Sequence, residues 1–390
     1  MASLVMLSPA PMIEAPGGEV ILDVKFVEGM KLHCQLWPGP VRCVLWRGAA
    51  SIDEPMRYAR ARLGFDLIML DAGAPVPELL LDEAAMVYVA ADDMKHLTLP
   101  TAMRGRMGKL VFTVEEALPG RLGAALAMQT SVRRRIGSTI WNIRHERRLR
   151  HALAQAEAIH CNGFPAHDAY QRVNPRALRY LDNRIRTPMM VRAAEQDQRA
   201  QALRAGGPLR LVWFGAMDPP SGIVDLLEMA HLLHLRGRPF RLDLIGAGPL
   251  QAKLRAGVEG LGLEDRVRVL PPMAFEPELV PFLRKNADIF VSPRRQPTPQ
   301  SAYIEAMGCG LPILGYGNHM VSRLQAESGA GWAARRGDVA GLARWVERLD
   351  DARDSVIAAS AKAVEYARQN SFESVFARRM TDLRQIAQVE

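Results

Sequence analysis

Residues that could hold a phosphorylated ligand are concentrated between Ser292 and Ile313. Thr298 is a favourable N-cap and Pro299 a favourable first helical residue, so we predict that a helix begins there. Gly308 and Gly310 predict where this helix ends. The free N–H groups at such a helix start, together with the helix dipole, attract an anion such as a diphosphate.

Glu305 could bind a ribose next to that diphosphate. It follows Pro299 by six residues, which in a helix is roughly 9 Å along the axis. A carboxylate at this distance could accept hydrogen bonds from two ribose hydroxyls while the start of the helix holds the phosphates. The spacing alone leaves open the alternative that Glu305 is an ordinary residue on the helix surface.

Two glycine turns follow apolar runs in the second half of the chain. Gly215 follows Arg210–Phe214, and Gly246 opens the turn Gly246-Ala247-Gly248. A glycine turn between a strand and a helix lets backbone N–H groups approach an anion. Every Rossmann-like unit has a glycine near this turn, so the two turns are only suggestive of a ligand.

The elements that would position these residues alternate between short apolar runs and longer amphipathic stretches, which is typical of βαβ units. The predicted strands of the first half are Leu4–Leu7, Val41–Trp46, Leu67–Leu70, Met86–Val89, Leu110–Val114 and Ala158–Cys161. Those of the second half are Leu209–Phe214, Arg241–Ile245, Val267–Leu270, Ile289–Val291 and Pro312–Gly315. We therefore predict an α/β protein with two doubly wound parallel sheets.

Length and composition predict two domains. At 390 residues the chain is too long for one ordinary hydrophobic core. Thr187–Pro208 has no strand pattern and ends in two glycines and a proline, which indicates an interdomain linker. We predict a first domain over residues 1–190, a second over residues 205–372, and a C-terminal helix over residues 373–390 that joins the first.

The cysteines and the apolar pattern indicate a cytoplasmic protein. The cysteines have neither a C-x-x-C pair nor the spacing of a zinc site or a disulfide framework. They are Cys34, Cys43, Cys161 and Cys309. The chain has no run of about eighteen apolar residues, and its N-terminus lacks the basic start and long apolar run of a signal peptide.

The formal net charge of +8 is largely local, because the segment Arg133–Arg150 is rich in arginine. Ile136, Ile140, Trp141 and Ile143 interrupt its arginines at roughly helical spacing. One interpretation is a basic amphipathic helix on anionic lipid at the inner face of the membrane. The other is a solvated basic face whose apolar side packs against its own domain. We do not expect nucleic acid as a partner, because aromatic residues are only 6% and no nucleic-acid motif accompanies the charge.

The run from Glu305 to Pro312, Glu-Ala-Met-Gly-Cys-Gly-Leu-Pro, resembles the E-A-M-A-C-G-x-P segment of the retaining glycosyltransferases of family 4, which have the GT-B fold. The order of strands and glycine turns also matches that family from Leu209 to Trp332. In the first half the resemblance is limited to Pro16-Gly17-Gly18, which is similar to the acceptor-side glycine loop of the family.

The resemblance implies a metal-independent enzyme that moves a sugar from a nucleotide-sugar, with retention, to a lipid-linked or polysaccharide acceptor. Glu305 would bind the ribose hydroxyls, and Gly215 and its loop would approach the diphosphate. The remaining implied residues are Gln300, Ser301 and Ala302 around the phosphate or donor sugar, Gly246 in the second donor-side turn, and Gly17 and Gly18 across the cleft.

The sequence departs from this family where charge matters. Pro297 replaces a glutamate that contacts the donor sugar, and residues 216–221 contain neither of the two bases that bind the diphosphate. Losing one such group typically costs about 3 kcal/mol of transition-state stabilisation. Arg294 and Arg295 could replace the bases, and the alternative for them is a solvated loop pair. Glu115 lies where the family often has a histidine, and could be a polar group on the acceptor side.

Three interpretations of function follow from these observations. The first is an active, divergent glycosyltransferase. The second is a glycosyltransferase-like protein without catalysis that acts as a binding or scaffolding partner. The third, with less support, is another enzyme built on two Rossmann domains, such as a nucleotide-sugar epimerase, which would need acid and base groups in its cleft.

Overall fold

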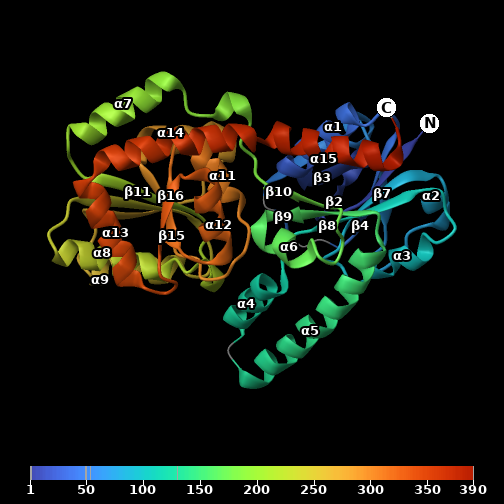
Figure 1. The fold of residues 1–390 in the computed structure, drawn as a ribbon, viewed down its shortest axis with the longest axis horizontal. Coiled ribbons are helices and arrows are strands. Elements are labelled where there is room, and N and C mark those ends of the chain that lie inside the picture. The colour runs from blue at the N-terminus through green and yellow to red at the C-terminus, as the bar shows by residue number, and fades with distance from the viewer. Residues whose placement is uncertain (1, 49–50, 53, 130, 390) are drawn as a thin grey trace. The chain divides into compact units, whose positions relative to one another are not determined.

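The computed structural model describes residues 2–48, 51–52, 54–129 and 131–389, which form two compact units (Figure 1). The first comprises Met1–Ala117, Ile140–Tyr180 and Glu373–Glu390, and the second comprises Leu118–Thr139 and Leu181–Phe372. The division differs from the expected first domain at two places, since residues 118–139 and 181–190 group with the second unit. Among the described residues, no helix combines the length and apolar character needed to cross a bilayer.

The first unit is built on a sheet of seven strands whose neighbours all pair in parallel. In spatial order these are β10 (Ala177–Tyr180), β9 (Ala158–Asn162), β8 (Lys109–Val114), β7 (Ala84–Ala90), β1 (Ser3–Leu7), β4 (Val41–Trp46) and β6 (Asp66–Leu70). The chain begins in the middle of the sheet, fills one side and then the other. This is the order of a doubly wound sheet.

Helices bury both faces of this sheet (Figure 1). On one face, α1 (Val24–Leu36) and α15 (Phe372–Ala387) pack against the apolar side chains of β1, β4 and β7. The other face is covered by three helices. They are α3 (Leu99–Ala102), the second half of α5 (Val132–Gln155) and α6 (Gly163–Tyr170). The minor elements of this unit are η1 (Pro16–Gly18), η2 (Arg60–Arg62), α2 (Glu78–Asp82) and η3 (His96–Thr98).

A small antiparallel sheet of β2 (Ile13–Ala15), β3 (Glu19–Asp23) and β5 (Pro55–Ala59) was not predicted. Gly17 and Gly18 lie in the turn between β2 and β3, with φ angles of 78° and 77°. The glycine pair is therefore part of a hairpin inserted between β1 and α1.

The second unit contains six parallel strands with the same winding. In spatial order they are β13 (Val267–Leu270), β12 (Phe240–Ala247), β11 (Leu209–Ala216), β14 (Ile289–Ser292), β15 (Ile313–Tyr316) and β16 (Gly331–Ala334). The predicted class, α/β with two doubly wound sheets, is confirmed. Strands β10 and β16 were missed, and the eleven predicted strands are all present.

The helices of the second unit include two that carry the site, α8 (Val224–Leu235) and α11 (Ser301–Gly308). The other elements are α4 (Leu118–Met128), the start of α5, η4 (Thr187–Met189), α7 (Ala193–Arg204), η5 (Pro219–Ser221), α9 (Gln251–Gly260), η6 (Phe275–Leu279), α10 (Val280–Asn286), α12 (His319–Ser328), α13 (Val339–Asp351) and α14 (Arg353–Gln369).

The stretch predicted to be a linker is instead largely α7, which packs against α10 and α14. Its buried positions include Arg199, whose side chain is 4% exposed. Arg199 donates hydrogen bonds to the carbonyl oxygens of Arg284 and Leu283 near the end of α10, and of Cys309 and Gly310 just after α11. The linker prediction was wrong because a helix that buries an arginine lacks the apolar periodicity by which helices are recognised.

Candidate functional site

The candidate site lies at the carboxyl ends of β11 and β14, the neighbouring strands where the winding of the second sheet reverses. In open α/β sheets the loops at such a switch point diverge and leave a crevice for a ligand. In this structure the two loops nevertheless meet at one point, since a Cβ on Gly222 would lie 2.4 Å from the carbonyl oxygen of Pro293. Gly222 also has a φ of 73°, so a side chain there would be both strained and obstructed.

Helix α11 begins at Ser301, with Gln300 as an extended N-cap residue at φ −138° and ψ 130°. The prediction that Thr298 is the N-cap was wrong by two residues, and the predicted end at Gly308 is confirmed. Thr298 is buried and its hydroxyl has no hydrogen-bond partner among the described residues. The N–H groups of Ser301 and Ala302 precede the first bond of this helix, which Tyr303 N–H donates to the Gln300 carbonyl oxygen at 3.2 Å. They are therefore available to a ligand.

Glu305 is buried in the middle of α11, with 1% of its side chain exposed, so the alternative of a surface residue is wrong. Its Oε1 accepts a hydrogen bond from Arg184 Nε at 3.0 Å. Its Oε2 has no hydrogen-bond partner among the described residues. An unsatisfied buried carboxylate oxygen is costly without a ligand or water, and ribose hydroxyls are donors that could satisfy it.

Arg184 was not identified from the sequence. Its guanidinium group lies over the ring of Phe275 at 4.2 Å from the centroid, while its Nε contacts Glu305. Cation–π contact and ion pairing together fix the plane of the guanidinium. No sequence signal connects positions 184 and 305, because only the folding of the second unit brings them together.

Arg294 and Arg295 have different partners. With the Gln300 amide oriented so that its oxygen faces the guanidinium group, Gln300 accepts from Arg294 Nε at 2.7 Å and Nη2 at 3.0 Å. Arg295 instead pairs with Asp225 of α8, at 2.8 Å from Nη2 to Oδ2. Tyr316 also donates to this carboxylate, at 2.7 Å. Arg294 is therefore held at the start of α11, whereas the charge of Arg295 is largely compensated.

The Gly215 and Gly246 turns bring the ends of β11 and β12 very close together. A Cβ on Gly246 would lie 2.0 Å from the carbonyl oxygen of Gly215, so only glycine fits there. The next charged residue is Asp218, which caps η5 by accepting a hydrogen bond from the backbone N–H of Ser221 at 2.9 Å. The structure therefore explains Gly246 by this close approach and Gly215 by its φ of 147°, and it adds no base to residues 216–221.

Helix α4 borders the site, although it comes from the first half of the sequence. It packs against η5, and a Cβ on Gly123 would lie 2.7 Å from Cγ of Gln296. Gln296 Oε1 is another buried atom without a hydrogen-bond partner in the described part of the chain. Together with Thr298 and with Glu305 of α11, it gives the site three buried oxygen atoms that lack partners among the described residues.

Glu115 of the first unit follows β8 and joins the carboxyl ends of three adjacent strands. Its Oε2 accepts from Asn162 Nδ2 at 2.7 Å and its Oε1 from the hydroxyl of Tyr180 at 2.6 Å. Both carboxylate oxygens of Glu115 thus have donors within its own unit. The acceptor-side roles of Glu115 and of Gly17 and Gly18 therefore stay predictions.

On α5, the apolar residues of the basic segment are exposed. Val132, Ile136, Ile140 and Ile143 are between 42% and 72% exposed, and their spacing of four, four and three residues places them in one stripe of the helix. The buried residues of α5 are others, chiefly Asn142, His145, Glu146, Leu149, Ala152 and Leu153. The alternative in which this apolar side packs against its own domain is therefore wrong.

Sequence comparison identifies the second unit more clearly than the first. Residues 208–351 match the family described as Glycosyl transferases group 1. The amylovoran biosynthesis glycosyltransferase AmsK of Erwinia amylovora is 28% identical over 157 residues, which are 38% of each chain. The 2-deoxystreptamine N-acetyl-D-glucosaminyltransferase of Streptomyces fradiae is 30% identical over 154 residues, 39% of this chain and 36% of that protein. The match thus spans less than half the length of these relatives.

Structural comparison covers the whole chain. The structure of HepE from Anabaena in complex with UDP is similar with a TM-score of 0.68 and 15% identity, and the alignment covers 98% of this chain and 99% of that one. At this identity the similarity establishes the fold alone. The chain therefore has the GT-B fold of two Rossmann-like domains.

Proposed function

We propose that the protein is a glycosyltransferase that moves a sugar from a nucleotide-sugar to a glycan during polysaccharide biosynthesis. The observation that carries the proposal is the buried Glu305, with one oxygen held by Arg184 and the other without a partner in the part of the chain that the structure describes. This arrangement is suited to two adjacent hydroxyls of a ribose. The match of residues 208–351 to the glycosyltransferase family supports it.

In the proposed donor complex, the diphosphate lies at the start of α11, beside Gly215 and the Gly246 turn. The N–H groups from Ser301 and Ala302 and the helix dipole would stabilise its charge. Arg294 would add the positive charge that residues 216–221 lack, because Gln300 holds its guanidinium group at this helix start. HepE binds UDP and UDP-glucose in its crystal structures, so uridine nucleotides are the first donors to test.

We further propose that transfer is metal-independent, proceeds with retention and uses a lipid-linked or polysaccharide acceptor. Support comes from the resemblance of the Glu305–Pro312 segment to the retaining enzymes of family 4. AmsK is named for amylovoran biosynthesis, and an acceptor of this polymeric kind fits the proposal. Transfer in the presence of excess EDTA, followed by NMR assignment of the product anomer, tests the first two points.

The proposed location is the cytoplasm, at the inner face of the membrane. The exposed stripe of Val132, Ile136, Ile140 and Ile143 on α5 lies among arginines, and this combination favours an anionic lipid surface. A lipid-linked acceptor would be presented at such a surface. Membrane contact by α5 would therefore bring the enzyme and its acceptor together.

The experiment that tests the proposal combines binding and turnover. Calorimetry with UDP, GDP and ADP and their sugar conjugates should show saturable binding of one nucleotide class. The same donor should then be hydrolysed slowly, or transferred when a glycan acceptor is added. Binding without hydrolysis or transfer would favour the scaffolding interpretation, and no binding to any nucleotide would refute both.

A further inference from the structure

A second candidate site is a basic cavity of about 560 Å³ on the second unit. It lies among α7, the start of β11 and the end of α10, and a cavity of this size is in the range that holds small molecules. Its lining residues are Glu195, Gln198, Arg199, Ala202, Arg210, Pro281, Arg284 and Lys285. Four of these eight side chains are basic and one is acidic.

This cavity is separate from the proposed donor site. Arg210 is the second residue of β11, whereas Gly215 lies near the carboxyl end of the same strand. Five residues of a parallel strand span roughly 16 Å. The cavity therefore opens at the amino end of the sheet, opposite the loops that approach the donor.

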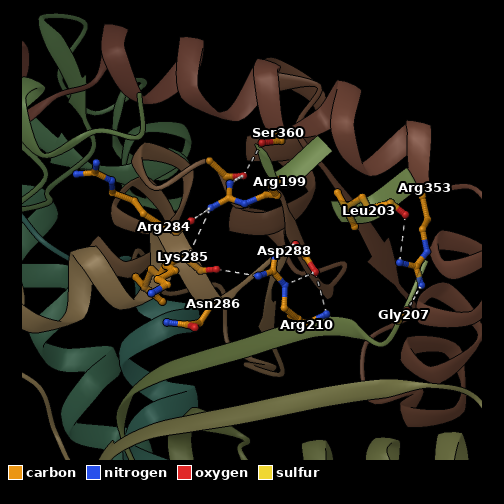
Figure 2. A network of polar contacts seen from close by, with 12 residues as sticks. Arg199, Leu203, Gly207, Arg210, Arg284, Lys285, Asn286, Asp288, Arg353 and Ser360 are labelled. Carbon is orange, nitrogen blue, oxygen red and sulfur yellow. Dashed lines mark hydrogen bonds and ion pairs between the residues drawn. The ribbon is translucent and has the colours of Figure 1, made fainter. Parts of the chain in front are cut away.

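Two of the four bases are neutralised by carboxylates. Arg284 Nε donates to Glu195 Oε2 at 3.0 Å. Arg210 pairs with Asp288 through its Nη2, at 2.6 Å to Oδ1, and through its Nε, at 3.0 Å to Oδ2 (Figure 2). These pairs keep the two guanidinium groups in place but contribute little net charge to the cavity.

The other two bases, Arg199 and Lys285, form no ion pair with a carboxylate among the described residues. Arg199 is buried, and its guanidinium group donates to backbone carbonyl oxygens rather than to a carboxylate (Figure 2). Its Nε has no hydrogen-bond partner in the described chain, and burial lowers its pKa. Lys285 is exposed, and within the described residues its ammonium group forms no hydrogen bond or ion pair.

The carbonyl contacts of Arg199 show that it also stabilises the ends of α10 and α11, so its burial by itself does not require a ligand. The cavity beside it adds the second argument. A buried charge that lacks a counterion is costly, and a bound anion would lower that cost. Lys285 and Gln198 line the same space with a mobile charge and an amide that can donate hydrogen bonds.

We propose that this cavity binds the phosphate group of a small phosphorylated molecule. Lys285 would contact the phosphate directly, and Arg199 would supply positive potential from the buried side. The volume leaves room for a polar body such as a sugar beside the phosphate. Nothing in this assignment depends on the activity proposed above.

The test is calorimetry of the full-length protein with inorganic phosphate at constant ionic strength, with chloride as the compensating ion. Wild type should bind phosphate saturably, and Lys285→Gln should raise the Kd by about tenfold or more, the usual effect of losing one charge-assisted hydrogen bond. Glucose 6-phosphate should bind in the same way, and glucose should not bind. Because Lys285 is exposed, the substitution should leave the melting temperature without phosphate unchanged.

Two matched variants locate the binding. Lys253→Gln removes the same charge from an exposed position on α9, and Arg294→Gln removes a base from the donor site. Both should keep the wild-type affinity for phosphate at the cavity. The proposal is overturned if no saturable binding occurs, if Lys253→Gln is as weak as Lys285→Gln, or if only Arg294→Gln loses binding.

Discussion

Arg184 Nε and Glu305 Oε1 are 3.0 Å apart, although 121 positions separate the two residues in sequence. The pair compensates the charge of a carboxylate that is almost fully buried. It also orients that carboxylate, because Arg184 takes one oxygen and the other has no partner among the residues described. The proposed ribose contact is therefore prepared before a nucleotide arrives.

Replacing Glu305 should weaken nucleotide binding. Two hydroxyl hydrogen bonds to a carboxylate are lost in Glu305→Gln or Glu305→Ala, so we expect at least about a thirtyfold rise in Kd. Glutamine preserves the volume, so the Glu305→Gln protein should keep the wild-type fold by circular dichroism. Unchanged affinity for the nucleotide, measured by calorimetry on a folded variant, would remove the ribose assignment.

Arg184→Met should act through Glu305 and not on its own. We expect a smaller loss of nucleotide affinity than in Glu305→Gln, and no further loss when the two are combined, because coupled residues are not additive. The specific measurement is the ratio of the Kd values of 2′-deoxy-UDP and UDP. If another nucleotide binds, its ribose and 2′-deoxyribose forms are compared in the same way. This ratio should fall in both single variants. An effect of Arg184→Met that simply adds to that of Glu305→Gln would contradict the positioning role.

The two arginines before α11 should contribute unequally to turnover. Arg294→Gln should reduce kcat by about a hundredfold or more, because charge on the departing nucleoside diphosphate loses its stabilisation. Donor binding should fall less. Arg295→Gln should have a much smaller effect, since Asp225 already compensates its charge. Equal effects on kcat would show that the contact with Gln300 does not determine which arginine stabilises the leaving group.

The α5 stripe should bind anionic vesicles. We expect co-sedimentation with phosphatidylglycerol-containing vesicles that decreases steeply with salt, because basic residues near such a surface each contribute roughly 1 kcal/mol and are screened within a Debye length. Ile136→Ser with Ile140→Ser should reduce the salt-resistant part of this binding. Leu235→Ser, another exposed apolar side chain at 67%, is the matched control. Absence of co-sedimentation at low salt would remove the membrane proposal.

Acid should destabilise the first unit through two buried histidines. Burial lowers the pKa of His160 to about 4 and that of His33 to about 3. Arg379 opposes the protonation of both, whereas Asp382 favours that of His160. Because the unfolded chain protonates histidine near pH 6.5, stability should be complete above that pH and should fall between about pH 6.5 and 4.

The measurement is urea unfolding at several pH values. His33 is the better residue to replace, since its Nδ1 contacts only the Gly29 carbonyl oxygen within its own helix and its Nε2 has no partner in the described chain. His33→Phe should flatten the dependence between pH 6.5 and 4. His167→Phe, a partly exposed histidine of the same unit, should leave the dependence unchanged. An unaltered slope in His33→Phe would assign the effect to other groups.

The sequence predicts most of the sheets because apolar runs bounded by glycine and polar residues are a local signal. It does not predict β16, whose residues Gly331–Ala334 include only one large apolar side chain. Nor does it predict the β2-β3-β5 sheet, in which β3 pairs with a strand that is distant in sequence, from Glu19 opposite Ala59 to Asp23 opposite Pro55. Helix α11 was located, but its start was misplaced, because Gln300, two residues after Thr298, is still extended and the first turn begins only at Ser301.

For the site, residue type and spacing identify Glu305 but not its environment. Its burial and its pairing with Arg184 depend on how the segment after β10 crosses the second unit, and no local pattern encodes that path. The different partners of Arg294 and Arg295 have the same origin. Adjacent residues on a loop point in different directions, and only the positions of Gln300 and Asp225 decide which arginine is compensated.

The return of α15 to the first unit has a consequence for synthesis on the ribosome. Met380, Leu383 and Ile386 fill the same core as Val27 and Met30, yet they are translated only after the whole of the second unit. The strands of that core are synthesised long before α15, so the core is incomplete until α15 has been translated. The second unit is complete once Phe372 has emerged, so its folding can precede that of the unit that contains the N-terminus. This reverses the usual vectorial order, in which N-terminal domains fold first.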